Sequence, residues 1–224
     1  EELLQIKNSY NEFLKKGSQL NVMVGFNRRF APPIQEIKKM FTKEQVKSIN
    51  IRVNSGILPS GHWVNDAEIG GGRIIGEACH FIDLAMFLAD SPIVSVVAES
   101  LNDTNKLSNT IVVSLKMENG SIASISYFAN GNKLVPKEFI EVFCGGTIAQ
   151  VNDFQKLEIF GEKSIKKNFK GQNKGHASCV KSFLSSINHG IECPIPFKES
   201  YISMLSTFMV LKSISQNRKI EITL

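Results

Sequence analysis

The chain has 224 residues, 42% of them hydrophobic, which is enough to bury the core of one large domain, or of one domain and part of another. Lys and Arg outnumber Asp and Glu by 26 to 21. This mild excess suits an anionic small molecule or no charged partner at all, and it is too dispersed to indicate a nucleic-acid partner. No apolar run approaches the roughly 18 residues that a membrane span needs, and no signal peptide opens the chain, so we expect no membrane partner.

The four cysteines, residues 79, 144, 179 and 193, form no Cys-x-x-Cys pair and suggest no disulfide framework. Reduced thiols and a cytoplasmic protein are therefore expected.

The N-terminal residues predict a helix followed by a buried strand. Apolar residues recur at helical spacing from Leu3 to Leu14, and Gly17 is placed to end the helix. Residues 21–26 (NVMVGF) form a short apolar run that is typical of a buried strand. Because the sequence starts inside the predicted helix and without Met, we expect it to be a piece of a longer protein.

The remaining residues predict an α+β domain. Period-two alternation and the turn signals Asn119-Gly120 and Gly145-Gly146 indicate a run of antiparallel strands. Helices are expected at about 31–41, 74–89, 175–189 and 198–216. The fold class is therefore an open, mostly antiparallel sheet with helices on one face. The other face also carries apolar residues, which predicts a partner subunit.

The stretch from Gly70 to Leu84 (GGGRIIGEACHFIDL) holds the residues best suited to chemistry. If the helix begins at Ile74, Glu77 and His80 lie three residues apart on one face, where a carboxylate can tune an imidazole for acid–base work. The alternative is structural. His80 could be a half-buried histidine, and Glu77 an acid that the dipole favours near a helix N-terminus.

Other candidates are weaker. His176 and Cys179 share a helix face but lack the further ligands of a zinc site, so we expect no metal. Cys79 adjoins His80, yet neighbouring helix residues point about 100° apart, which favours an inert buried thiol. A second informative stretch is Gly25–Phe30 (GFNRRF), where polar residues follow a predicted strand at the position where ligands collect in α/β sheets; paired surface arginines are the alternative.

These two stretches together resemble the glucose-fructose oxidoreductase and inositol dehydrogenase family (Gfo/Idh/MocA). Residues 24–32 (VGFNRRFAP) are similar to the segment that ends the family's Rossmann domain. Residues further along match the segment that opens the helix lining the family's active site: Trp63, Gly70–Gly72, His80 and Asp83. Residues 175–190 and 215–222 look like the family's C-terminal elements, so the resemblance covers essentially the whole chain.

The resemblance implies two domains. Residues 1–27 would be the C-terminal tail of a dinucleotide-binding domain that is otherwise missing here, and residues 28–224 a substrate-binding and oligomerisation domain. The full-length protein would be an NAD(P)-dependent oxidoreductase acting on the CH–OH group of a sugar, cyclitol or nucleotide sugar. A subgroup-level likeness points to surface-polysaccharide biosynthesis. A homodimer through the open sheet face is expected.

The resemblance also implies site residues. The family's proton-handling group joins a Lys from a Glu-Lys-Pro motif, an Asp and a His. The His corresponds to His80, the Asp position is Gly76, and Glu77 stands one residue along, so His80 and Glu77 are the catalytic candidates. The Lys would lie before residue 1.

Cofactor contacts are expected from Asn27, Arg28 and Trp63, and substrate contacts from Asn54 and Arg29. Val64 stands where the family often has an Arg.

The cofactor of the full-length protein would be NAD or NADP, and the sequence does not choose between them. The 224 residues contain no Gly-x-Gly-x-x-Gly fingerprint. We therefore expect this piece alone to bind NAD(P) weakly and to be inactive. The departure at Gly76 leaves an alternative open, a non-catalytic binding or assembly module derived from the family.

Overall fold

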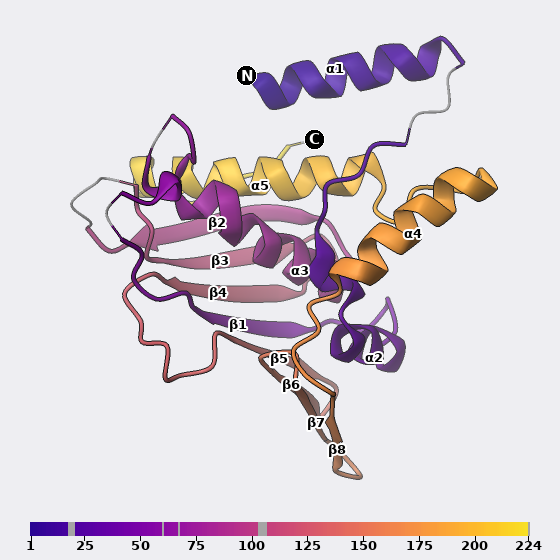
Figure 1. Ribbon diagram of the computed structural model, residues 1–224, viewed down its shortest axis with the longest axis vertical. Coiled ribbons are helices and arrows are strands. Elements are labelled where there is room, and N and C mark those ends of the chain that lie inside the picture. The colour runs from indigo at the N-terminus through magenta and orange to yellow at the C-terminus, as the bar shows by residue number, and fades with distance from the viewer. Residues whose placement is uncertain (18–20, 60, 67, 103–106, 224) are drawn as a thin grey trace.

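The computed structural model describes residues 1–17, 21–59, 61–66, 68–102 and 107–223, with helices along one face of a large sheet (Figure 1). The helices and helical turns are α1 (Glu2–Lys15), η1 (Asn27–Phe30), α2 (Pro32–Met40), η2 (Trp63–Asn65), η3 (Ile74–Ala78), α3 (Cys79–Ala89), α4 (His176–His189) and α5 (Phe197–Gln216). The strands are β1 (Ser48–Asn54), β2 (Ile93–Ser100), β3 (Ile111–Met117), β4 (Ile122–Phe128), β5 (Glu138–Cys144), β6 (Thr147–Asn152), β7 (Lys156–Phe160), β8 (Ile165–Asn168) and β9 (Ile220–Glu221).

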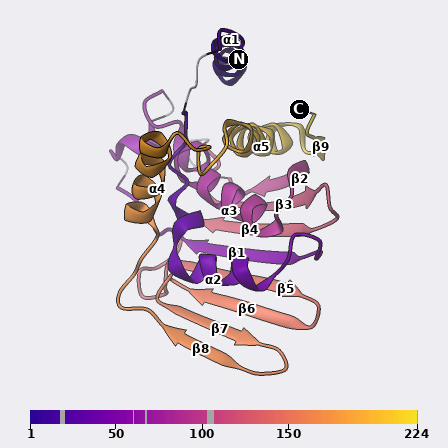
Figure 2. The ribbon, with the colours of Figure 1, turned by 90° about the vertical axis from the view of Figure 1, so that its right-hand side faces the viewer.

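The described strands form a nine-stranded sheet in the order β8-β7-β6-β5-β1-β4-β3-β2-β9, which Figure 2 shows from the β2 side down to β8. The β1–β4 pair is parallel, and the other described pairs are antiparallel. The predicted fold class is confirmed. β1 is inserted between β4 and β5, so its C-terminal end brings Asn54 and Ser55 beside the β4–β5 connection.

The core lies between the sheet and its helices. Strand β3 shows the pattern that produces it, with Ile111, Val113 and Leu115 buried and the residues between them exposed. Helix α5 packs on β2, and α3 packs on β1 and β4. Nearly every residue of α3 is buried, since sheet, α5 and η1 surround it. None of the helices in the described part of the chain is long and apolar enough to cross a membrane.

The N-terminal segment differs from the sequence prediction. Helix α1 forms as expected but stands apart from the sheet (Figures 1 and 2), held by stacking of Tyr10 on Phe197 with ring centroids 3.9 Å apart. Residues 21–26 are extended but pair with no described strand, and Val22 and Val24 are exposed. The predicted buried strand is therefore wrong here, because a strand needs a neighbour to share its backbone hydrogen bonds.

Gly175, the N-cap residue of α4, packs closely against η1. Its φ is +84°, and a Cβ there would lie 2.4 Å from the carbonyl oxygen of Asn27 and 2.6 Å from the nitrogen of Ala31. We expect G175A to lower the free energy of unfolding by about 1–2 kcal/mol for the left-handed backbone and by about 1–3 kcal/mol more for the overlap.

The matched control is G190A, at the other end of α4, where φ is +61° and no described atom lies within 4 Å of the position that a Cβ would take. G190A should therefore lower the free energy of unfolding only by the cost of the left-handed backbone. Urea unfolding measures both variants, and equal losses would show that the Gly175 contact with η1 contributes nothing to stability.

Candidate functional site

Two buried arginines fix the turn η1 to the rest of the domain. Arg28 donates to both oxygens of Glu138, at 2.9 and 3.0 Å, and its guanidinium lies 4.3 Å from the ring centroid of Phe81. Glu138 is fully buried at the start of β5 and also accepts from Lys174 at 2.6 Å. This pairing follows from burial, because a carboxylate without a cation would be very costly there.

Arg29 forms the second pair. Its guanidinium donates to both oxygens of Asp83 on α3, at 2.7 and 2.6 Å, and also to Glu199 of α5. Ser203 donates to Asp83 at 2.9 Å. Burial lowers the pKa of Arg29, but Asp83 and Glu199 outweigh it and raise that pKa overall, so the cation persists. η1 is therefore tied to both helices that flank the candidate site.

The glycine-rich stretch leads into a π-turn. Gly70 packs so closely on the loop at Trp63 that a Cβ would lie 2.5 Å from the Trp63 carbonyl oxygen. The predicted α-helix starting at Ile74 is wrong at its beginning, because residues 74–78 form a π-helix and the α-helix starts at Cys79. Such turns hold an extra residue and are often found at functional sites. α-Helical spacing therefore does not relate Glu77 to His80.

Glu77 is directed to the sheet. Its carboxylate accepts hydrogen bonds from the hydroxyl of Tyr127 on β4 and from the ammonium of Lys137, and Ser55 lies 3.3 Å away. Tyr127 also lies 2.8 Å from Ser55. Burial raises the pKa of Glu77, but the hydrogen bonds from Lys137 and Tyr127 outweigh it and lower that pKa overall. Glu77 is therefore a charged anchor for three side chains.

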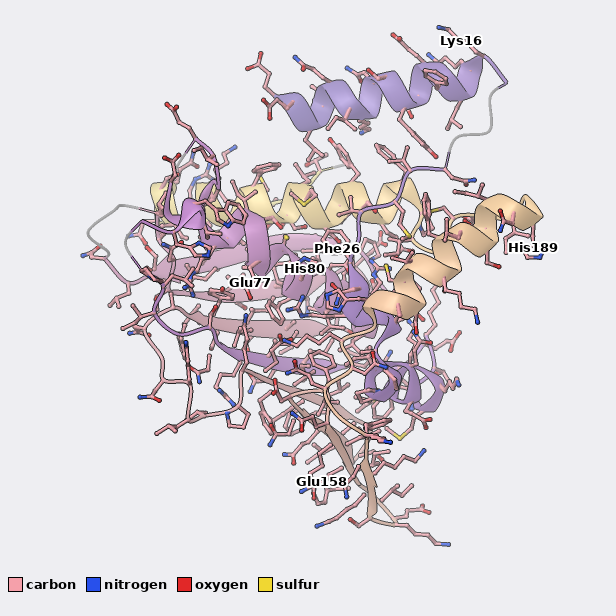
Figure 3. All side chains as sticks on the ribbon, viewed as in Figure 1. Lys16, Phe26, Glu77, His80, Glu158 and His189 are labelled. Carbon is pink, nitrogen blue, oxygen red and sulfur yellow. The ribbon has the colours of Figure 1, made fainter. Side chains whose placement is uncertain are left out.

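His80 lies between Phe26 and Glu77 in Figure 3. The edge of one ring faces the other, with centroids 5.5 Å apart between His80 and Phe26. Nδ1 of His80 is buried and has no hydrogen-bond partner among the described residues. Burial and the charge of Arg28 lower the pKa of His80 to about 4, although Glu77 and Glu138 act in the opposite direction. The imidazole is neutral at pH 7 and has a nitrogen without a partner in the described part of the protein.

The other residues predicted to contact cofactor or substrate differ in how close they lie to the buried ion pairs of η1. Asn27 is buried and donates to the carbonyl of Lys174 at 2.7 Å, close to Arg28. Trp63 is exposed on its loop and stacks on His62. Asn54 lies on the same open face of the sheet as Asn50. Its amide donates to two carbonyls of the β4–β5 connection. The structure does not bring Asn54 together with His80, and all these assigned contacts stay predictions.

Sequence reasoning missed residues that lie at the ends of β1, β4 and β5: Ser55, Tyr127, Lys137 and Glu138. Lys137 and Glu77 are separated by 60 positions in the chain. No local motif connects them, and only the parallel insertion of β1 between β4 and β5 brings the strand ends together. The one signal was a charged pair, Lys137-Glu138, opening a strand that is otherwise apolar at alternate positions.

The weak metal candidates were His176 and Cys179. Burial raises the pKa of Cys179, which disfavours the thiolate that a metal requires. Among the described residues, no three His, Cys, Asp or Glu side chains gather closely enough to hold a metal ion. His176 instead lies near enough to His80 to oppose its protonation.

Comparison with known proteins identifies the family to which this domain belongs. Residues 43–164, more than half of the chain, match the model of the GFO/IDH/MocA C-terminal domain. The chain belongs to the GFO/IDH/MocA family, and it carries that family's C-terminal domain. A search of curated proteins finds no match.

Solved structures share the fold. A dehydrogenase from Clostridium difficile is 26% identical with a TM-score of 0.69, over 87% of this chain and 63% of that one. The UDP-N-acetylglucosamine 3-dehydrogenase of Acidithiobacillus ferrooxidans is 14% identical with a TM-score of 0.79, over 96% of this chain and 67% of that one. A levoglucosan dehydrogenase in complex with NADH and levoglucosan is 16% identical with a TM-score of 0.78, over 92% of this chain and 67% of that one.

Proposed function

We propose that this chain is the substrate-binding and dimerisation domain of an NAD(P)-dependent oxidoreductase that acts on a CH–OH group of a sugar, cyclitol or nucleotide sugar. The observation that carries the proposal is His80, a neutral imidazole whose Nδ1 has no partner among the described residues, beside the buried pairs of η1. The dehydrogenases that share this fold support it.

The chemistry divides between cofactor and protein. A bound nicotinamide supplies the hydride acceptor. His80 takes the proton that leaves the substrate hydroxyl, because its imidazole is neutral at pH 7 and the residue is only partly buried. Glu77 stays charged and holds Lys137 and Tyr127. Asn27 and Arg28 fix η1, whose preceding residue, Phe26, packs on His80.

The test is turnover of the full-length protein with NAD or NADP. The candidate substrates are myo-inositol, D-glucose, levoglucosan and UDP-N-acetylglucosamine, and the signal is the absorbance of reduced nicotinamide. We expect at least one pair to react. Absence of turnover, with the sugars still bound, would favour the alternative, a non-catalytic binding module.

The domain division and the dimer are parts of the same proposal. Residues 1–27 would pack with the dinucleotide-binding domain, which is supported by α1 burying none of its own residues. The open sheet face would join two copies in a cytoplasmic homodimer, which is supported by exposed apolar side chains on β3, β4, β5 and β7: Val112, Ile122, Phe143 and Phe160. Light scattering of the full-length protein tests the dimer, and a monomer at high concentration would contradict it.

A further inference from the structure

Lys137 is held at the site by its hydrogen bond to one carboxylate. Its ammonium donates to Glu77, and its side chain remains 35% exposed. A lysine ammonium has three donors, so it can serve a further partner. Lys137 immediately precedes Glu138, which is buried against Arg28, so the backbone at this end of β5 is fixed. The side chain of Lys137 is therefore held at a fixed strand end and is still partly exposed to solvent.

The Glu77 carboxylate is already engaged by two donors. Each of its carboxylate oxygens already accepts from a donor, one from Lys137 and the other from Tyr127. Tyr127 is fully buried, and the pairing with Glu77 consumes its hydroxyl proton. The carboxylate thus fixes the ammonium in place, which is the usual role of a residue supporting a ligand-binding group.

Lys137 and His80 belong to one electrostatic cluster. Glu77, the partner of Lys137, and Glu138, its neighbour in the chain, both favour protonation of His80. Glu77 therefore holds the partly exposed Lys137 side chain three positions before His80, whose Nδ1 has no partner among the described residues. An ammonium donor and a proton acceptor in the same region of the fold suit a polyhydroxylated ligand, whose neighbouring oxygens accept and donate.

We propose that Lys137 is a substrate-contacting residue, whose ammonium donates a hydrogen bond to a hydroxyl or carbonyl oxygen of the sugar, with Glu77 and Tyr127 as its positioning residues. This inference rests on the proposed function. It assigns the Glu77 carboxylate a positioning role in place of acid–base catalysis. It also means that this domain contributes a lysine ammonium to substrate binding.

The test compares K137M with K156M in the full-length protein. Lys156 is a matched control because it pairs with Glu158 at 2.8 Å with 42% of its side chain exposed, on β7. Ligand-observed NMR with NADH present measures the binding of myo-inositol, D-glucose, levoglucosan and UDP-N-acetylglucosamine. We expect K137M to weaken binding of an accepted sugar about ten- to hundredfold, and K156M to leave it unchanged.

Kinetic and unfolding measurements distinguish a contact between Lys137 and the substrate from a purely structural role of Lys137. K137M should raise KM, or lower kcat/KM, while its unfolding midpoint stays close to that of K156M. E77Q should weaken binding less than K137M, since the ammonium remains but its anchor is neutral. Binding by K137M equal to that of the unaltered protein overturns the proposal, even where turnover upholds the proposed function. Failure of all four sugars to bind the unaltered protein also overturns it.

Discussion

Replacement of Arg29 by methionine is expected to lower the free energy of unfolding by about 3–5 kcal/mol, the usual cost of removing one partner of a buried ion pair. Arg29 is 3% exposed and Asp83 is 1% exposed. In the variant, the hydroxyl of Ser203 is the donor that remains to the Asp83 carboxylate within the described part of the chain. A buried carboxylate in that state must either take up a proton or draw water into the core.

The control is K38M, which breaks a pair of similar length at the surface. Lys38 lies 2.8 Å from Asp90, with side chains 24% and 37% exposed. Pairs of this kind contribute about 0–1 kcal/mol. Urea unfolding with unchanged m-values measures both losses. Equal midpoints for R29M and K38M would show that the Arg29 pair does not hold η1 in place.

This prediction also bears on the role expected for Arg29 as a substrate contact. Its guanidinium already donates to Asp83 and Glu199, so a substrate oxygen would have to displace one of them. The ion pair with Arg29 also gives Asp83, a residue of the matching family segment, a structural role. We expect R29M to weaken substrate binding only indirectly, because η1 is continuous with Phe26 and Phe26 packs on His80.

The sequence alone predicts the sheet well. On β3 the alternating apolar residues face the helices as expected, and the Asn119-Gly120 turn joins it to β4. On β4 Ile125 is buried as expected, but Ile122 lies on the other face and is exposed. Such alternation is a local property, set by which face of a strand is buried. The extended residues 21–26 show the limit of that reasoning, because apolar character predicts a strand only where a neighbouring strand exists.

The site was less predictable than the sheet. His80 could be selected from its motif, but the partners of Glu77 depend on the π-turn at residues 74–78 and on the ends of β1, β4 and β5. Spacing rules assume regular helices, so a single π-turn changes which side chains meet. The two arginines of η1 also had unpredictable partners, since these come from α3, α5 and β5.

Replacement of His80 by glutamine is expected to lower kcat by about 10²–10⁴-fold in the full-length protein with an accepted sugar, the usual contribution of a general base. Glutamine preserves a polar side chain beside Phe26 but cannot take the proton. His189, exposed at the end of α4, provides the control H189Q. Activity of H80Q equal to that of H189Q would contradict the assignment of His80.

The same histidine should leave a signature in stability that does not depend on activity. The pKa of His80 is about 4 in the folded protein and 6.5 in its unperturbed state. Between these values the unfolded chain binds the proton and the folded one does not, so the free energy of unfolding falls as the pH is lowered from 6.5 towards 4. H80Q should flatten this dependence while H189Q retains it. If both variants keep the full slope, the imidazole of His80 is not the desolvated, neutral group that proton acceptance requires.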